Sequence, residues 1–168
     1  MQDTLIQWFQ QTLGGIFSNE VIVFIISMMP ILELRGGMVA ATLMNIPYLK
    51  AAALCIIGNL LPVPFILWFI TPLFNLLKKT KWLRPLVEKL ENRAMNKKDQ
   101  IEKATFWGLM LFVGIPLPGT GAWTGGLIAS MLDIPFKRAF PAIVLGVLLA
   151  FIIMSVITYV IPWLITLI

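Results

Sequence analysis

Hydrophobic residues dominate the chain on both sides of one charged segment at positions 78–103. Two runs without a charged residue, 51–77 and 139–168, exceed the roughly 20 apolar residues that a helix needs to cross a membrane. We therefore predict two full transmembrane helices. The first of them is expected to bend or unwind at Pro62 and Pro64, because proline interrupts helical hydrogen bonding.

Two more apolar stretches, 20–44 and 104–132, are each broken near the middle by proline. Pro30 breaks the first stretch, and Pro116 and Pro118 break the second. No straight helix passes through such a segment, and broken backbone at membrane depth occurs only where protein buries it or where it lines a cavity. We predict that each stretch is a re-entrant hairpin, in which two half-helices enter the membrane and return to the same side. One kinked transmembrane helix is the alternative.

The two halves of the chain resemble each other when they are aligned without gaps at a shift of 88 positions. In this alignment the first proline-broken segment falls on the second, and the later turn Ile46-Pro47 falls on Ile134-Pro135. Apolar sequences often match by chance, but prolines and glycines that match in one register do not follow from apolar composition. We therefore predict an internal duplication. Identical residues meet at Pro30, Gly37, Ala41, Ile46, Pro47, Ala51, Gly58, Leu60 and Leu61.

The distribution of charge predicts the orientation of the chain. The segment 78–103 carries nine basic and four acidic residues, which accounts for the whole net charge of +5. Because positive loops stay in the cytoplasm, we place this segment there, as an amphipathic helix on the membrane surface. Re-entrant hairpins then give two inverted halves, with Lys137 and Arg138 inside and the C-terminus outside. Hairpins that span fully would move both cations outside, against the charge rule.

The composition is that of an integral membrane protein. Of the 168 residues, 59% are hydrophobic and 12% are charged, against about 25% charged in soluble domains. We predict one membrane domain over 1–168, with an interfacial helix at 1–19, repeat 1 at 20–77, the basic segment at 78–103 and repeat 2 at 104–168. So few spans enclose little space, which favours a homodimer in the lipid bilayer. The N-terminus lacks a basic segment before its apolar run, so we expect no cleaved signal peptide.

The chain lacks the side chains that most enzymes and metal sites use. It has no histidine, and its single cysteine, Cys55, cannot form a disulfide within the chain. The single carboxylate near the hairpin breaks leaves little for acid–base or nucleophilic chemistry. We therefore expect a protein that is not an enzyme and that has no metal, no cofactor and no nucleic-acid partner.

Two charged residues of the first hairpin are candidates for function. Glu33 and Arg35 are the only charges between Glu20 and Lys50. A charge at membrane depth costs roughly 2.5–3.5 kcal/mol on insertion scales, so such groups face a partner or a water-filled path. Glu33 is the candidate proton or cation carrier, and Arg35 is the candidate for binding anionic groups. The alternative is a structural ion pair between them, which needs a non-helical tip because residues two apart on a helix do not face each other.

The second hairpin offers backbone groups instead of charges. After its prolines, the amides of residues 119–122 would begin a half-helix and present unpaired N–H groups and a positive dipole end. Close helix packing through glycine and alanine is the alternative explanation. An anion between Arg35 and these amides, or a cation at Glu33, are both compatible with the sequence. The candidate substrate-binding or coupling residues are Pro30, Glu33, Arg35, Gly36, Gly37, Pro116, Pro118, Gly119, Thr120, Gly121, Trp123 and Thr124.

With these residues, the chain resembles a bacterial family of small multi-drug export proteins. The resemblance rests on the segments Pro30–Gly37 and Ile115–Gly125 and extends over nearly the whole chain. It implies a multi-pass protein of the bacterial inner membrane that exports small compounds. The architecture is also similar to that of DedA-type membrane proteins, which implies movement of lipid phosphates.

We therefore expect an all-α integral membrane transporter built from two inverted repeats. Its substrates would be small amphipathic or anionic compounds, and we hypothesise that their transport is coupled to protons through Glu33. A transporter or flippase of lipid phosphates is the second reading. A membrane scaffold that transports nothing is the third, and it predicts tips that are packed without a cavity.

Overall fold

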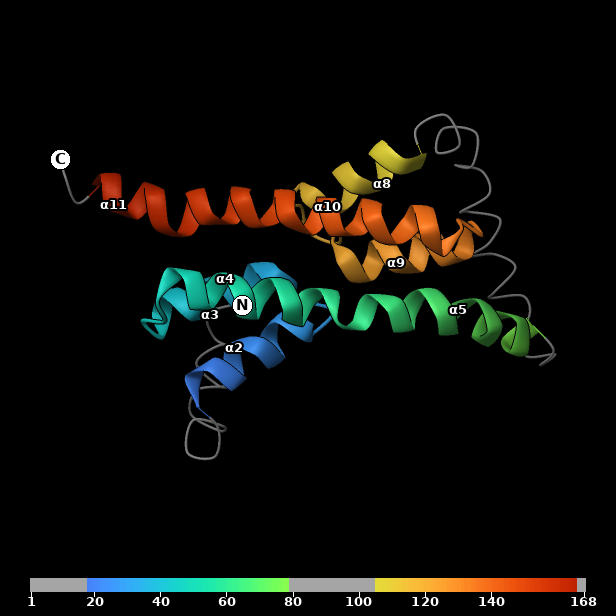
Figure 1. Cartoon of the computed structure of the whole chain (residues 1–168), viewed down its shortest axis with the longest axis horizontal. Helices are drawn as coiled ribbons and strands as arrows, with labels where there is room; N and C mark the ends of the chain where they lie inside the picture. Colours follow the sequence, from blue (N-terminus) through green and yellow to red (C-terminus); the bar gives the residue numbers. More distant parts are fainter. Residues whose placement is uncertain (1–17, 79–104, 166–168) are drawn as a thin grey trace.

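The computed structural model describes residues 18–78 and 105–165, and every regular element in these two segments is helical. The predicted interfacial helix at 1–19 and the predicted surface helix at 78–103 lie almost wholly outside the described residues. The elements, shown in Figure 1, are α2 (Asn19–Met28), α3 (Glu33–Leu43), α4 (Tyr48–Leu60), α5 (Pro62–Lys78), α8 (Thr105–Gly114), α9 (Ala122–Met131), α10 (Phe136–Ser155), the π-helix η1 (Val156–Val160) and α11 (Ile161–Ile165).

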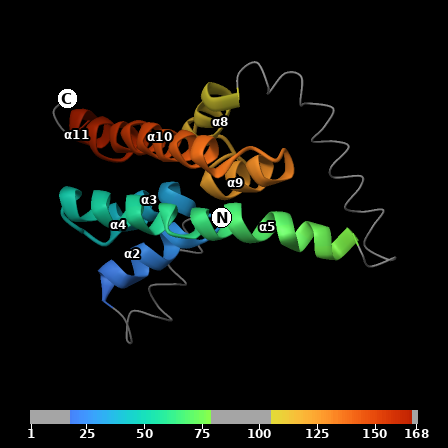
Figure 2. The same cartoon turned by 45° about the vertical axis from the view of Figure 1, so that its right-hand side comes forward.

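Two long helical rods run lengthwise through the molecule. In both views the α4–α5 rod and the α10–η1–α11 rod extend along the same axis but in opposite chain directions (Figures 1 and 2). Residues 48–70 and 136–165 are long and apolar enough to cross a membrane. The first rod is interrupted only at Leu61, and Pro62 then begins α5, where its missing N–H would be unpaired in any case.

Each rod is preceded by a pair of shorter helices. Helices α2 and α3 pack against each other and are joined by residues 29–32, which we call the first tip. Helices α8 and α9 are joined by residues 115–121, which we call the second tip. Each of these helices has ten or eleven residues, which corresponds to about 15 Å, or half of a membrane's hydrocarbon core.

The turns that follow α3 and α9 have the same backbone conformation. Asn45 has a φ of 54° and Asp133, at the same place in the other half, has a φ of 52°. In both turns the next residue donates back to the helix, from Ile46 N to Ala41 O and from Ile134 N to Ala129 O, at 2.9 Å each. The sequence match between the halves is therefore accompanied by a match in local structure.

Equivalent glycines also bring equivalent helices into close contact. A Cβ atom added to Gly58 of α4 would lie 2.8 Å from the Phe24 carbonyl oxygen of α2. One added to Gly146 of α10 would lie 2.7 Å from the Met110 carbonyl oxygen of α8. Glycine is needed at both positions because the facing atom is backbone, which cannot move aside as a side chain can.

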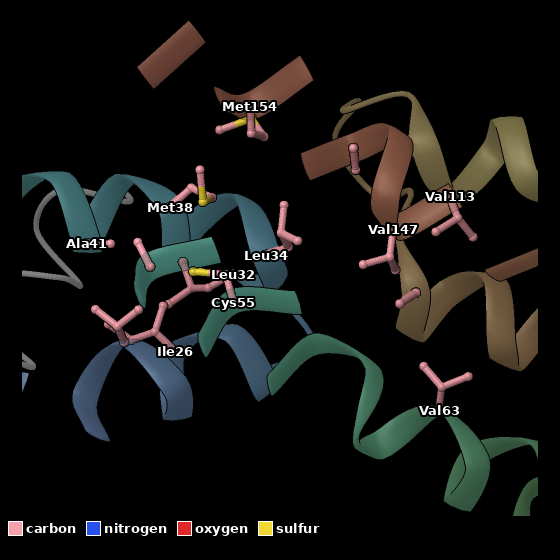
Figure 3. Packing of buried hydrophobic residues seen from close by; sticks show 14 of the residues in the cluster. Ile26, Leu32, Leu34, Met38, Ala41, Cys55, Val63, Val113, Val147 and Met154 are labelled. Atoms are coloured by element: carbon pink, nitrogen blue, oxygen red, sulfur yellow. The ribbon is translucent and has the colours of Figure 1, made fainter. Parts of the chain in front are cut away.

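The core consists of apolar side chains from both halves, while a large apolar surface stays uncovered. Figure 3 shows Ile26, Met38 and Cys55 together among the first-half helices, and Val113 beside Val147 in the second half. Large side chains on α5, including Trp68 and Phe69, are exposed. Fewer than half of the residues in either candidate span are buried. An uncovered apolar surface of this kind suits a lipid environment.

Candidate functional site

The carboxylate of Glu33 caps the first turn of α9 in the other half of the molecule. The amide of Ala122 donates to its Oε2 and the amide of Trp123 donates to its Oε1, both at 3.1 Å. The residue before α9, Gly121, has no side chain with which to accept these bonds. A negative charge at this position satisfies unpaired amides and complements the positive end of the helix dipole.

Unusual backbone conformations bring the carboxylate to this position. Gly121 has a φ of 135°, and a Cβ atom there would collide with the Glu33 carboxylate. Glu33 itself has a φ of 50°, in the left-handed region that costs a residue with a side chain roughly 1–2 kcal/mol. Strain held by the surrounding structure is found most often at functional sites. The strained backbone therefore marks Glu33, among the residues of α3, as a candidate functional residue.

Arg35 binds the segment that follows α8. Its Nη1 donates to the Leu117 carbonyl oxygen, and its Nη2 donates to Thr120 Oγ1 at 2.8 Å and to the Ile115 carbonyl oxygen at 3.4 Å. The Thr120 hydroxyl lies 2.8 Å from the Ile115 carbonyl oxygen and helps to hold it in place. These acceptors follow the negative end of the α8 dipole, where a cation is favourable.

Glu33 and Arg35 therefore bind the second tip and α9 rather than each other. Within residues 18–70 and 106–165 the only ion pair joins Glu20 and Lys50, so the salt bridge between Glu33 and Arg35 that the sequence allowed is not formed. The amides at the start of α9, which the sequence offered to an anionic ligand, are occupied by the chain's own carboxylate.

A cavity of about 570 Å³ lies between the two tips. The predicted site residues in its lining are Pro30, Glu33, Arg35, Pro116, Pro118, Gly119, Thr120 and Thr124. Residues from both halves thus surround one space. The described residues hold no group of three metal-ligating side chains, and the cavity wall has one carboxylate and one guanidinium as its charges.

Four predicted site residues lie outside the cavity lining and have structural contacts instead. Gly36 packs against Leu32, and a Cβ atom on Gly37 would collide with the Ser27 hydroxyl. Gly121 leaves room for the Glu33 carboxylate. The indole N–H of Trp123 donates to the Met28 carbonyl oxygen at 2.9 Å and fastens α9 to the end of α2.

Sequence reasoning missed the part of the lining that comes from the last rod. Met154 of α10 and Ile157 of η1 complete the cavity, together with Ile31 and Leu32 of the first tip. Met154 and Ile157 lie in an uninterrupted apolar run, so composition did not distinguish them from other membrane residues. Pro162 was the available signal, because a proline lacks the donor that an α-helix needs, and π-helical segments are frequent at functional sites.

Comparison with known protein families assigns the chain to one of them. Residues 33–153, more than half of the chain, match the family described as "Putative small multi-drug export protein". The matched region contains both charged cavity residues, the whole second tip and most of α10. Comparison with curated proteins and with solved structures gave no significant match, so the similarity to DedA-type proteins has no support from them. The chain is a membrane protein whose regular elements, in the part that the structure describes, are all helices, and it belongs to the small multi-drug export protein family.

Proposed function

We propose that this protein is a small membrane transporter whose substrate site is the cavity between the two tips. The observation that carries the proposal is that both tips and the last rod line one cavity, with Glu33 and Arg35 in its wall. Charged residues at membrane depth mark substrate or ion pathways by default. The cavity has one carboxylate and no histidine, so we propose transport and not catalysis.

The two halves are proposed to be inverted repeats with re-entrant hairpins. Opposite chain directions of the two rods, matching turns after α3 and α9, and matching glycines in α4 and α10 support this arrangement. The short helices are each about half a membrane thick, so a pair of them enters and leaves on one side. Broken helices that meet at a central site are a recurring plan of secondary transporters.

Cysteine accessibility in intact cells tests this topology. In a Cys55→Ser background, single cysteines replace Pro47, Lys50, Pro135 and Ile165, and a membrane-impermeant thiol reagent is added outside. Inverted re-entrant halves of an inner-membrane protein predict labelling at 47, 50 and 165 but not at 135. Labelling at 135 with protection at 165 would mean that the hairpins span the membrane, and the inverted-repeat proposal would be abandoned.

Glu33 is the proposed proton carrier of the transport cycle. Its carboxylate accepts two amide N–H groups of α9, and a protonated carboxyl would lose part of this acceptor capacity. Protonation would thus loosen the contact between the two halves at the wall of the cavity. Arg35 is the charged residue that shares the cavity wall, while the second tip and α9 contain no charged residue.

Filling the cavity tests the transport site directly. Purified protein in liposomes is assayed for counterflow of two fluorescent amphipathic compounds, dansylglycine and the cation ethidium. Thr124→Trp places a large ring in the cavity wall and is expected to lower counterflow at least tenfold. Thr42→Trp, at an exposed position of α3 outside the cavity, is the matched control and should transport normally. Equal counterflow by both variants would contradict the proposed site.

Movement of lipid phosphates is the second candidate function. Ile31 at the cavity rim is 81% exposed, so an acyl chain could pass from the cavity into the surrounding lipid. A scaffold without transport was expected to have tips packed without a cavity, and the 570 Å³ space weighs against it.

We also propose a homodimer, for which native mass spectrometry from lipid nanodiscs gives the number of copies.

A further inference from the structure

We infer that the cavity binds small amphipathic anions and that Arg35 recognises their acidic group. This names the ligand class of the proposed transport site and rests on that site being the place where substrate binds. The sequence left two options open, an anion at Arg35 or a cation at Glu33. The contacts of the two side chains decide between them.

Glu33 is poorly placed to attract a cation from the cavity. The residue is buried, with only 5% of its surface exposed. Both carboxylate oxygens already accept backbone N–H groups, from Ala122 and Trp123. A cationic ligand would therefore meet a carboxylate that is covered and whose charge is opposed by the positive end of α9.

Arg35 is partly exposed at the same cavity and faces only neutral partners. Its acceptors are the carbonyl oxygens of Leu117 and Ile115 and the Thr120 hydroxyl. A guanidinium has five N–H donors in a planar fork. Among residues 18–78 and 105–165, no acceptor is bound to its Nε–H, and no carboxylate lies within ion-pair distance. The accessible charge of the cavity is therefore a cation whose hydrogen-bond partners are all neutral.

Two further groups of the lining can donate a hydrogen bond to a ligand. The Thr124 hydroxyl makes no hydrogen bond to the described part of the chain. The Gly119 amide also has no acceptor there, and the space in front of the Gly119 α-carbon is open, with no atom within 4 Å of a Cβ placed on it. An acidic group with several acceptor oxygens matches an arginine, a hydroxyl and an amide better than an ammonium group does.

The rest of the lining requires an apolar body on the ligand. Ile31, Leu32, Met154 and Ile157 contribute side chains without polar groups, apart from the weakly polar thioether of methionine. The volume of about 570 Å³ falls in the range of roughly 300–1,000 Å³ typical of small-molecule sites. A free amphipathic acid and the phosphate headgroup of a lipid share this chemistry.

Two dansyl probes of opposite charge test the inference. Wild-type protein in phosphatidylcholine nanodiscs is titrated with dansylglycine and with a matched dansyl-aminoethyl-trimethylammonium cation, and empty nanodiscs are subtracted. We expect the carboxylate probe to bind at least about tenfold more tightly than the cation. Arg35→Gln should weaken the carboxylate probe at least about tenfold and leave the cation unchanged, since hydrogen bonds to charged groups have this strength. The exposed Arg138→Gln is the matched control and should bind as wild type.

A second variant protects the test against misfolding, because Arg35→Gln also removes contacts to the second tip. Thr124→Val keeps the arginine contacts and the side-chain volume, and it should weaken the carboxylate probe about three- to tenfold. Equal binding of the two probes, or tighter cation binding, would overturn the anion inference. In that case Thr124→Trp decides whether the transport site is kept. If this variant no longer bound either probe, the cavity would still be the binding site. If it bound both probes as wild type does, the proposed transport site would be wrong as well. If wild type bound neither probe, both the anion inference and the proposed transport site would be contradicted.

A third experiment distinguishes a lipid headgroup from a free amphipathic acid as the natural ligand. Nanodiscs that contain about one fifth phosphatidic acid are compared with pure phosphatidylcholine nanodiscs. Competition between phosphatidic acid and dansylglycine that disappears in Arg35→Gln supports a lipid headgroup as the natural ligand. Unchanged dansylglycine binding supports a free amphipathic acid. Competition that persists in Arg35→Gln would contradict recognition of the acidic group by Arg35.

Discussion

The two halves of this molecule share a backbone plan but use opposite kinds of groups where they meet. The first half supplies charged side chains, Glu33 and Arg35, while the second supplies backbone amides and carbonyls from a tip without any charge. At the shift of 88 positions, Glu33 falls on Gly121, and both residues have positive φ. At this aligned position the first half has a charged side chain, and the second half has a glycine that leaves room for it.

This difference shows how the ends of two short helices are satisfied inside the protein. The carboxylate binds the positive start of α9 and the guanidinium binds carbonyls that follow the negative end of α8. Both helix ends at the second tip are thus bound by a charged side chain from the first half. Neither tip could be buried alone without unpaired polar groups.

Gly121→Ala should break this arrangement most severely. The new Cβ would collide with the Glu33 carboxylate, and alanine would be strained at a φ of 135°. Conformational strain and the loss of hydrogen bonds to a buried charge together predict a loss of about 3–5 kcal/mol in the free energy of unfolding. Thermal unfolding in detergent micelles, followed by tryptophan fluorescence, measures the effect.

Gly119→Ala is the matched control for that substitution. Gly119 also has positive φ, of 80°, but no atom lies within 4 Å of a Cβ placed there. Only the conformational cost of about 1–2 kcal/mol remains. Equal destabilisation by the two substitutions would show that the carboxylate does not depend on the space at Gly121.

Glu33→Gln should have the next largest effect. Glutamine keeps the shape of the side chain, but its NH₂ group faces an amide donor, so one of the two bonds to α9 is lost. We expect a loss of about 1.5–3 kcal/mol in the free energy of unfolding. If Glu33 carries protons, dansylglycine counterflow by this variant should also lose its dependence on pH. Full transport with an unchanged pH profile would remove Glu33 from the coupling mechanism.

Much of the fold could be predicted from the sequence because prolines and uninterrupted apolar runs act locally. Pro30 and the pair Pro116 and Pro118 mark both tips, and the run 139–168 contains most of the second rod. Several of the predicted residues also line the cavity, since charges and prolines are conspicuous in an apolar sequence. Re-entrance, inversion and dimerisation remain predictions.

The partners of the charged residues could not be predicted, because they depend on how the two halves cross. Glu33 lies close to Arg35 in the sequence, and an ion pair between them was the local alternative. The carboxylate instead binds amides of α9, and no local pattern connects these positions. Met154 and Ile157 were missed for a related reason, since the apolar run around them has no feature that marks a cavity wall.

Substitution of the equivalent glycines Gly58 and Gly146 by alanine tests whether the two halves are built alike. Each new Cβ would lie within 3 Å of a backbone carbonyl oxygen of the neighbouring helix. Overpacking of this kind costs about 1–3 kcal/mol, and the two variants should lose similar amounts of unfolding free energy. Ile57→Ala, at a position that is 56% exposed, should cost less than either. A large loss at one glycine and none at the other would contradict the similar packing of the two halves.

Glu20→Gln should have the smallest effect, although the Glu20 carboxylate forms the ion pair that Glu33 lacks. Lys50 Nζ lies 2.8 Å from Glu20 Oε1, but both side chains are substantially exposed, and exposed pairs contribute little. The hydrogen bond from Lys50 lowers the pKa of Glu20 from its usual 4.5 to about 2. The pair therefore stabilises the fold above pH 4.5 and loses this contribution as the pH falls towards 2. The unfolding midpoints of Glu20→Gln and wild type should be nearly equal at pH 7, and the small difference should vanish on acidification. A change in midpoint as large as that of Glu33→Gln would mean that Glu20 is not in water.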